Sequence, residues 1–322
     1  MDVAQLLGIP RLPAEMVRVE DALRASLGAA DPFLVEVAGH LLGAGGKRIR
    51  PALTVAAALA AGSDVTDDVV LGGVSVELVH IGSLYHDDVM DGADSRRGVE
   101  SVNHRWGNLV AILAGDFLLA KASEIAASLG NDVAALLART IGRLCEGQVG
   151  ELQTAFDVGR TEAQYLASIR GKTASLTSAA CRIGGLVARR SDAETDALTS
   201  FGESFGMAFQ IRDDILDVIG DEAVLGKPVG QDLVEGTYSL PIIRALADPE
   251  SGAELAPLLG RPLDPPEMDK ARAIVRASRA VEEAKQAARE HAARAAEALE
   301  PLGHNAAAEG LRHATYRLLD AW

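Results

Sequence analysis

The chain has 322 residues, of which 48% are hydrophobic and 24% are charged, a composition that allows a sizeable globular core. Its 46 acidic residues outnumber the 31 basic ones, which gives a net charge of −15. So acidic a chain gains nothing from counterion release, and we therefore expect no nucleic-acid partner.

The two cysteines, Cys145 and Cys181, lie far apart and lack metal-ligand spacing, which suits a reducing compartment. The N-terminus carries no basic-then-apolar signal segment. The longest apolar run, Ala52–Ala61, is too short to cross a bilayer. We therefore expect a cytoplasmic protein with no membrane span.

Ala and Leu dominate, and apolar residues recur at helical spacing, which predicts an all-α protein. In chain order, the long predicted helices cover Asp67–Asp91, Trp106–Gly130, Asp132–Asp157, Asp192–Ile219 and Pro266–Glu300. Helix starts are indicated at Asp31-Pro32 and by capping boxes at Thr161–Gln164 and Ser191–Glu194. No linker divides the chain, so residues 1–322 are predicted to form one domain.

The first chemical motif is His86-Asp87-Asp88-Val89-Met90-Asp91, which closes the predicted helix Asp67–Asp91. Asp87 and Asp91 are four residues apart, so they project from one helix face and repel each other. A hard cation bridged to phosphate explains this cluster, because magnesium prefers a few carboxylates together with phosphate oxygens. A solvated helix end with a chance group of acids is the alternative.

The segment Gln210–Asp217 repeats the pattern inside another apolar helix, with Asp213 and Asp217 four residues apart. Helical bundles build metal sites from carboxylates that project inward from facing helices. Two such motifs on different helices therefore predict a shared metal site, and surface acids become a less favoured explanation.

Basic residues form four clusters that stand out in an acidic chain. In Gly45-Gly46-Lys47-Arg48-Ile49-Arg50-Pro51, three cations lie beside a glycine turn at a helix start, which favours an anion. The other clusters are Arg96-Arg97-Gly98, Gly171-Lys172-Thr173 and Gly226-Lys227-Pro228. None has P-loop spacing. A single cation is more often a surface charge, but four clusters beside two acidic motifs indicate phosphate binding.

These motifs, in this order over Gly43–Pro241, resemble the signatures of the trans-isoprenyl (polyprenyl) diphosphate synthase family, and its bacterial long-chain members in particular. The resemblance implies a single-domain all-α bundle around a deep central cavity, of the isoprenoid synthase type, usually as a homodimer. It also implies a magnesium-dependent prenyltransferase. Such an enzyme lengthens an allylic diphosphate, such as farnesyl or geranylgeranyl diphosphate, by successive head-to-tail condensation with isopentenyl diphosphate.

The resemblance also implies residue roles. The metal ligands would be Asp87, Asp91, Asp213 and Asp217, while Asp88 and Asp214 point elsewhere. The allylic diphosphate would be bound by Arg96, Lys172 and Lys227. Isopentenyl diphosphate would be bound by Lys47, Arg50, His80 and Arg97. Thr173 and Gln210 would lie near the developing carbocation. From the residue alone, His80 is equally well explained as a hydrogen-bonded core histidine.

Two features bear on substrate and product. Thr237 stands where the family often has Lys, so one diphosphate contact is missing or replaced. Gly82 and Ser83, five and four residues before Asp87, are small, whereas short-chain members tend to have aromatic residues there.

The segment 111–120 resembles the long-chain members, and Phe117 or Leu118 could be the next residue to limit growth. We therefore predict an all-trans product of about 35–50 carbons, with a geranylgeranyl product of about 20 carbons as the alternative.

Three other classes of protein account for part of this pattern. A class I terpene cyclase shares the first motif but normally has an Asn/Ser/Glu-type second motif, unlike Asp213–Asp217. A non-catalytic subunit of a heteromeric synthase could lose its acidic motifs, yet both are intact here. A structural helical protein is the third. Magnesium-dependent turnover by the chain alone separates the enzymes from the rest.

Overall fold

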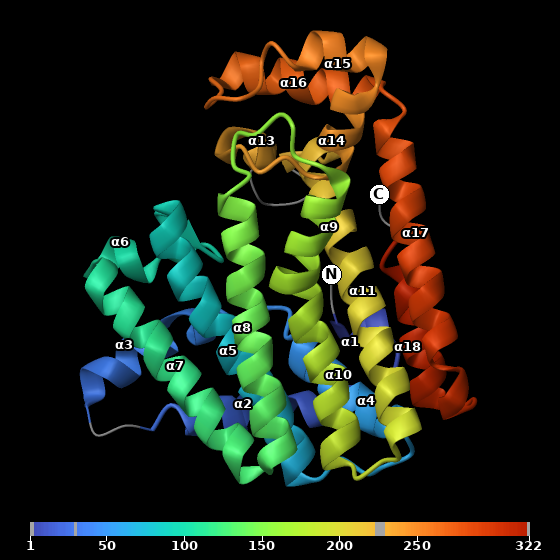
Figure 1. The fold of residues 1–322 in the computed structure, drawn as a ribbon. Coiled ribbons are helices and arrows are strands. Elements are labelled where there is room, and N and C mark those ends of the chain that lie inside the picture. Colours follow the sequence, from blue (N-terminus) through green and yellow to red (C-terminus); the bar gives the residue numbers. More distant parts are fainter. Residues whose placement is uncertain (1–2, 29–30, 223–228, 321–322) are drawn as a thin grey trace. The chain divides into compact units, whose positions relative to one another are not determined.

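The computed structural model describes residues 3–28, 31–222 and 229–320 (Figure 1). The described residues form an all-α protein, as predicted, apart from a small antiparallel hairpin. Its strands, β1 (Ser95–Arg96) and β2 (Val99–Glu100), pair Ser95 with Glu100 and Arg96 with Val99.

The chain divides into two compact units, which are described separately. Unit 1 comprises Met1–Ile141, Leu176–Gly202 and Leu299–Ala314. Unit 2 comprises Gly142–Ser175, Glu203–Ala298 and Thr315–Trp322. The predictions of one domain and of a central cavity stay predictions.

Unit 1 contains the N-terminal helices and the 3-10 turn η2. They are α1 (Val3–Leu7), α2 (Leu12–Ser26), α3 (Pro32–Gly43), α4 (Ile49–Ala60), α5 (Asp67–Asp91), α6 (Val102–Trp106), α7 (Asn108–Ser128) and η2 (Glu300–Leu302). Four helices are divided between the units: α8 (Asn131–Leu152), α10 (Ser175–Val187), α11 (Asp192–Ile219) and α18 (Ala306–Arg317).

Helix α5 is the centre of unit 1 and packs against α2, α4 and α7. It is the one described helix that is long and apolar enough to cross a membrane by length and composition alone. However, 72% of its most apolar window is buried inside the structure, as expected for a core helix. This corrects the sequence estimate that no apolar stretch reaches spanning length, because isolated polar residues within α5 hide its apolar character.

Unit 2 contains the remaining elements. They are α9 (Glu162–Ile169), the π-helical turn η1 (Arg170–Ala174), α13 (Gln231–Glu235), α14 (Leu240–Ala247), α15 (Pro249–Leu255), α16 (Pro265–Ala277) and α17 (Ala280–Ala298). The predicted helix Pro266–Glu300 is thus two helices, with a break at Ser278, whose backbone is extended (ψ 165°).

The predicted helix starts are confirmed. Asp31 accepts the N–H groups of Phe33 and Leu34, and the boxes at Thr161 and Ser191 are both formed. Helices 67–91 and 192–219 have the predicted bounds.

Candidate active site

The acidic motif of unit 1 lies in the last turns of α5. Asp87 is half-buried and Asp91 exposed, one turn apart on the same helix face. Asp88 differs, because it is fully buried and its Oδ1 accepts a hydrogen bond from Arg96 Nε (2.7 Å) and forms an ion pair with Arg96 Nη2 (2.5 Å). Burial raises the pKa of the Asp88 carboxyl, and Arg96 opposes that rise. Asp88 therefore holds Arg96, a predicted diphosphate ligand, while Asp87 and Asp91 are accessible to a cation.

The predicted isopentenyl diphosphate ligands of unit 1 gather around the same helix. Lys47 is exposed, while the buried Nε of Arg50 has no hydrogen-bond partner. Burial lowers the pKa of Arg50, and so does the nearby Arg97. The pKa of His80 lies well below 6.5, because of burial and the charges of Arg50 and Arg97. His80 is therefore neutral, and the two arginines form a concentrated positive charge suited to an anion.

The basic motif Gly171-Lys172-Thr173 lies in the π-helical turn η1 of unit 2. Gly171 in this turn packs directly on Gly147 of α8, and a Cβ added to Gly171 would lie 2.8 Å from the Gly147 Cα. Both glycines are therefore required for this close approach. Lys172 follows, and its Nζ pairs with Glu151 Oε1 at 2.6 Å, one turn beyond Gly147 on α8. Single π-helical turns often occur at functional sites.

A chain of side-chain hydrogen bonds joins η1 and α9 to the second acidic motif. Thr173 Oγ1 donates to Gln210 Oε1 (2.7 Å), and Gln210 Nε2 donates to Asp214 Oδ1 (2.7 Å). Tyr165 donates to the other oxygen, Asp214 Oδ2, at 2.6 Å. Burial raises the pKa of Asp214 to about 7, although both hydrogen bonds lower it. The structure thus brings together Thr173 and Gln210, while Asp213 beside them is half-buried.

Asp217, predicted as a metal ligand, has a structural role in unit 2. It is 6% exposed, and its two carboxylate oxygens accept the N–H groups of Gln231 and Asp232, both at 3.2 Å. These groups begin α13, so Asp217 fixes the start of that helix. Lys227, the remaining predicted phosphate ligand, lies outside the described residues.

Arg160 and Tyr165 are residues that sequence reasoning missed. Arg160 is 4% exposed, and its Nη1 donates to the carbonyl oxygen of Tyr238 at 3.0 Å, next to Thr237. Burial lowers its pKa, and the charges of Glu151, Tyr165 and Asp214 oppose that effect. A buried cation therefore lies beside the segment in which Thr237 replaces the usual Lys. No motif marked Arg160, because only the fold shows that it is buried.

The residues predicted to control product length lie where α5 crosses α7. A Cβ on Gly82 would lie 3.1 Å from the Gly115 carbonyl oxygen and 3.4 Å from Leu118 Cβ. The small size of Gly82 is therefore explained by packing against α7. Tyr85, two residues before Asp87, points away from this crossing, and its hydroxyl donates to the Val37 carbonyl oxygen at 2.8 Å.

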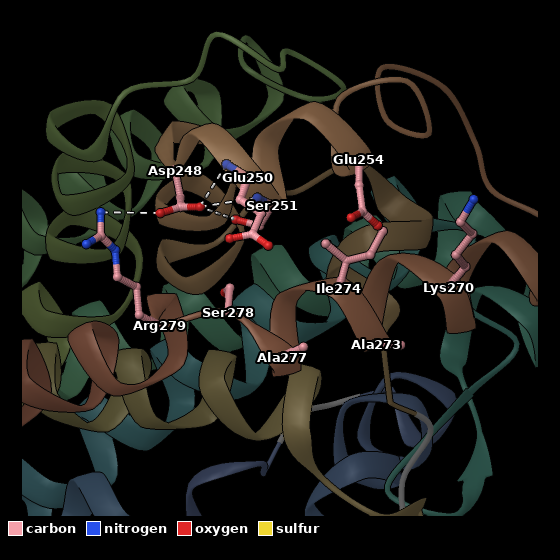
Figure 2. A pocket seen from close by; sticks show the side chains of 10 residues that line it. All are labelled: Asp248, Glu250, Ser251, Glu254, Lys270, Ala273, Ile274, Ala277, Ser278 and Arg279. Carbon is pink, nitrogen blue, oxygen red and sulfur yellow. Dashed lines mark hydrogen bonds and ion pairs between the residues drawn. The ribbon is translucent and has the colours of Figure 1, made fainter.

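A cavity of about 690 Å³ in unit 2 contains none of the predicted site residues (Figure 2). It lies between α15 and α16, where Arg279 pairs with Asp248 at 3.3 Å. Asp248 also accepts the N–H groups of Glu250 and Ser251. These contacts explain Asp248 and Arg279 by local helix capping and an ion pair.

Among the described residues, no three His, Cys, Asp or Glu side chains are grouped to hold a metal ion. A magnesium ion does not need such a group, because it is usually bound by one or two carboxylates, with phosphate oxygens and water completing the shell. Asp87 and Asp91 supply hard oxygen donors at the accessible end of α5. The residues therefore fit a divalent cation bound together with a diphosphate.

Comparison with known proteins identifies the family. The family described as polyprenyl synthetase matches residues 31–277. The nonaprenyl diphosphate synthase of Mycobacterium tuberculosis is 39% identical over 92% of this chain and 89% of that protein. Component 2 of the heptaprenyl diphosphate synthase of Geobacillus stearothermophilus is 39% identical over 84% of each chain.

Among solved structures, the polyprenyl synthase of Caulobacter crescentus, complexed with calcium and isoprenyl diphosphate, is similar with a TM-score of 0.92. It is 33% identical over 99% of this chain and 97% of that chain. The chain belongs to the polyprenyl synthetase family and is an enzyme, a prenyltransferase. This excludes a purely structural protein, and it places the chain outside the terpene cyclases.

Proposed function

We propose that this enzyme extends an allylic diphosphate by repeated condensation with isopentenyl diphosphate, to an all-trans product of about 35–50 carbons. One observation carries the proposal. His80 and Asp87 are seven residues apart on the continuous helix α5, so they share a face about 10 Å apart along the axis. Arg50 and Arg97 beside the neutral His80 supply a cationic site, and a cationic site and an acidic metal site along one helix suit two diphosphate substrates.

We propose that magnesium is the divalent cation, held by Asp87 and Asp91 and by Asp213, with Asp217 contributing directly or through water. When bound, it supplies positive charge against the departing diphosphate, which is where negative charge develops. Arg96, Lys172 and Lys227 bind the allylic diphosphate.

Four residues of the chain bind isopentenyl diphosphate: Lys47, Arg50, His80 and Arg97. Its double bond attacks the allylic carbon as the carbon–oxygen bond breaks, and the proton then lost passes to the released diphosphate. Thr173 donates to the Gln210 amide oxygen, which fixes that oxygen near the carbocation. No protein nucleophile is required.

The Thr237 position fits this scheme through Arg160. The Tyr238 carbonyl oxygen accepts from Arg160, which gives the segment a buried positive charge from a different part of the chain. Arg160 therefore replaces part of the electrostatic role of the usual Lys.

We also propose that the enzyme is a homodimer through the exposed face of α7. Leu109, Leu113 and Ile112 on this helix are 79%, 64% and 40% exposed. Neighbouring exposed apolar side chains of this size typically mark an interaction surface. Leu113→Glu should then give monomers in sedimentation experiments, and a dimeric Leu113→Glu protein would disprove this interface.

Both cysteines are free thiols, which supports the proposed cytoplasmic location.

The test is a product assay on the purified chain with magnesium, labelled isopentenyl diphosphate and farnesyl diphosphate. Products of 35 carbons or more, absent from Asp87→Ala and Asp213→Ala, would support the proposal. A stop at about 20 carbons would keep the chemistry but refute the long product. No elongation by the chain alone would indicate a missing partner subunit.

A further inference from the structure

Arg48 of unit 1 forms a buried ion-pair network that the proposed chemistry does not use. Its side chain is 5% exposed and lies between helices α2 and α5. Nε donates to Glu20 Oε1 of α2 at 2.5 Å, and Nη1 donates to Glu77 Oε1 of α5 at 3.1 Å. Burying a guanidinium is unfavourable unless its charge is matched, and the two carboxylates match it.

The same guanidinium holds the backbone of the turn between α3 and α4. Nη2 of Arg48 donates to the Leu42 carbonyl oxygen at 3.0 Å, and Nη1 reaches that of Gly45 at 3.5 Å. Arg97 donates to the Gly45 carbonyl oxygen as well. A Cβ on Gly46 would lie 2.8 Å from Arg97 Nη1 and 3.1 Å from Arg48 Nη1. Two arginines therefore fix this turn against the rest of the unit.

The turn has a conformation that needs such support. Arg48 has φ 48°, in the left-handed region that L-residues with a side chain rarely adopt. Lys47 precedes Arg48 directly, and Arg50 follows two residues later. The direction in which these two cations leave the backbone thus depends on the strained Arg48.

We propose that Glu20 is a positioning residue for isopentenyl diphosphate: through Arg48 it holds the turn that places Lys47 and Arg50 on the diphosphate. This inference rests on the proposed function, because it assigns those two cations to that substrate. Glu20 lies in α2, remote in sequence from every motif, and its contact with Arg48 connects it to the site.

The experiment compares Glu20→Ala and Glu20→Gln with the control Glu15→Ala. Glu15 lies on the same helix and pairs with Arg18 at 2.6 Å. Glu20→Ala should raise the KM for isopentenyl diphosphate about tenfold, with kcat changed less than about twofold and the KM for farnesyl diphosphate unchanged. Glu20→Gln, which keeps a weaker hydrogen bond, should lie between Glu20→Ala and the wild type.

A purely structural role for Glu20 would lower the active fraction, and with it kcat, while leaving both KM values unchanged. That result, or an equal rise of both KM values, would overturn the inference. Arg48→Lys is the second variant, since an ammonium cannot make all these bonds, and it should show the same selective rise even if Glu20→Ala does not fold. If the wild type does not elongate, the proposed function of the chain on its own fails, whereas unchanged KM values in active variants refute the positioning role alone.

Discussion

The contact between Gly147 of α8 and the π-helical turn η1 gives the sharpest stability prediction. A Cβ at Gly147 would lie 2.5 Å from the backbone nitrogen of Lys172 and 2.8 Å from the Ser168 carbonyl oxygen. Non-bonded heavy atoms prefer about 3.5 Å or more, so the added methyl overlaps by about 1 Å. Both neighbours are backbone atoms, one in η1 and one in α9, and relief of the overlap requires α8 to move away from them.

The expected magnitude follows from two opposing effects. Ala is favoured over Gly in a helix interior by about 1 kcal/mol. Overpacking a close contact costs about 1–3 kcal/mol, and a backbone contact lies at the upper end of that range. Gly147→Ala should therefore lower the free energy of unfolding by about 2 kcal/mol. Gly142, on the same helix, has nothing within 4 Å of its added Cβ, so Gly142→Ala should raise it by up to about 1 kcal/mol.

Urea unfolding of the wild type and both variants, followed by circular dichroism, measures this difference. Elongation activity should fall in Gly147→Ala, because Lys172 and Thr173 lie in the displaced turn. A Gly147→Ala protein as stable as Gly142→Ala would refute the argument that the glycine pair is needed for close packing.

Three further predictions concern single side chains. Arg96→Met should lower the free energy of unfolding, measured in urea, by about 3 kcal/mol, because it leaves the buried Asp88 carboxylate without the partner Arg96. Burial lowers the pKa of His291 to about 4, so the imidazole binds a proton more readily in the unfolded chain than in the folded one. The free energy of unfolding should therefore fall by about 2 kcal/mol between pH 7 and pH 5. The variant His291→Gln should remove that loss. Tyr165→Phe removes a hydrogen bond that lowers the Asp214 pKa, so it should raise that pKa and destabilise the protein by about 1–2 kcal/mol in thermal unfolding.

The long helices were predictable because local patterns determine them. The Thr66 side chain caps the start of α5, and Gly92 (φ 62°) is the cap that follows its last residue. Thr and Gly are residue types typical of these two cap positions, so the sequence itself indicates both ends. The break at Ser278 was missed, because no Gly or Pro marks it in an Ala- and charge-rich segment. Arg279 instead pairs with Asp248, which is distant in sequence, so a tertiary contact accompanies the break.

The candidate site was predictable in its residue types but not in their partners. Lys47, Arg48 and Arg50 look equivalent in the sequence, yet only Arg48 is buried between two carboxylates. Asp213 and Asp217 likewise look equivalent, and only the fold shows that Asp217 begins α13. Such differences depend on neighbours far along the chain, which spacing within one motif cannot reveal.

The π-helical turn has a consequence for insertions and deletions. Tyr165 and Thr173 are eight residues apart, yet both reach the Gln210–Asp214 pair of α11. In a regular α-helix, residues seven apart share a face, and residues eight apart diverge by about 80°. The turn absorbs the additional residue. Deleting one residue between Ile169 and Thr173 would leave Tyr165 and Thr173 seven apart in a regular helix and keep both contacts, whereas inserting one residue there would rotate Thr173 off the shared face and break the chain of hydrogen bonds.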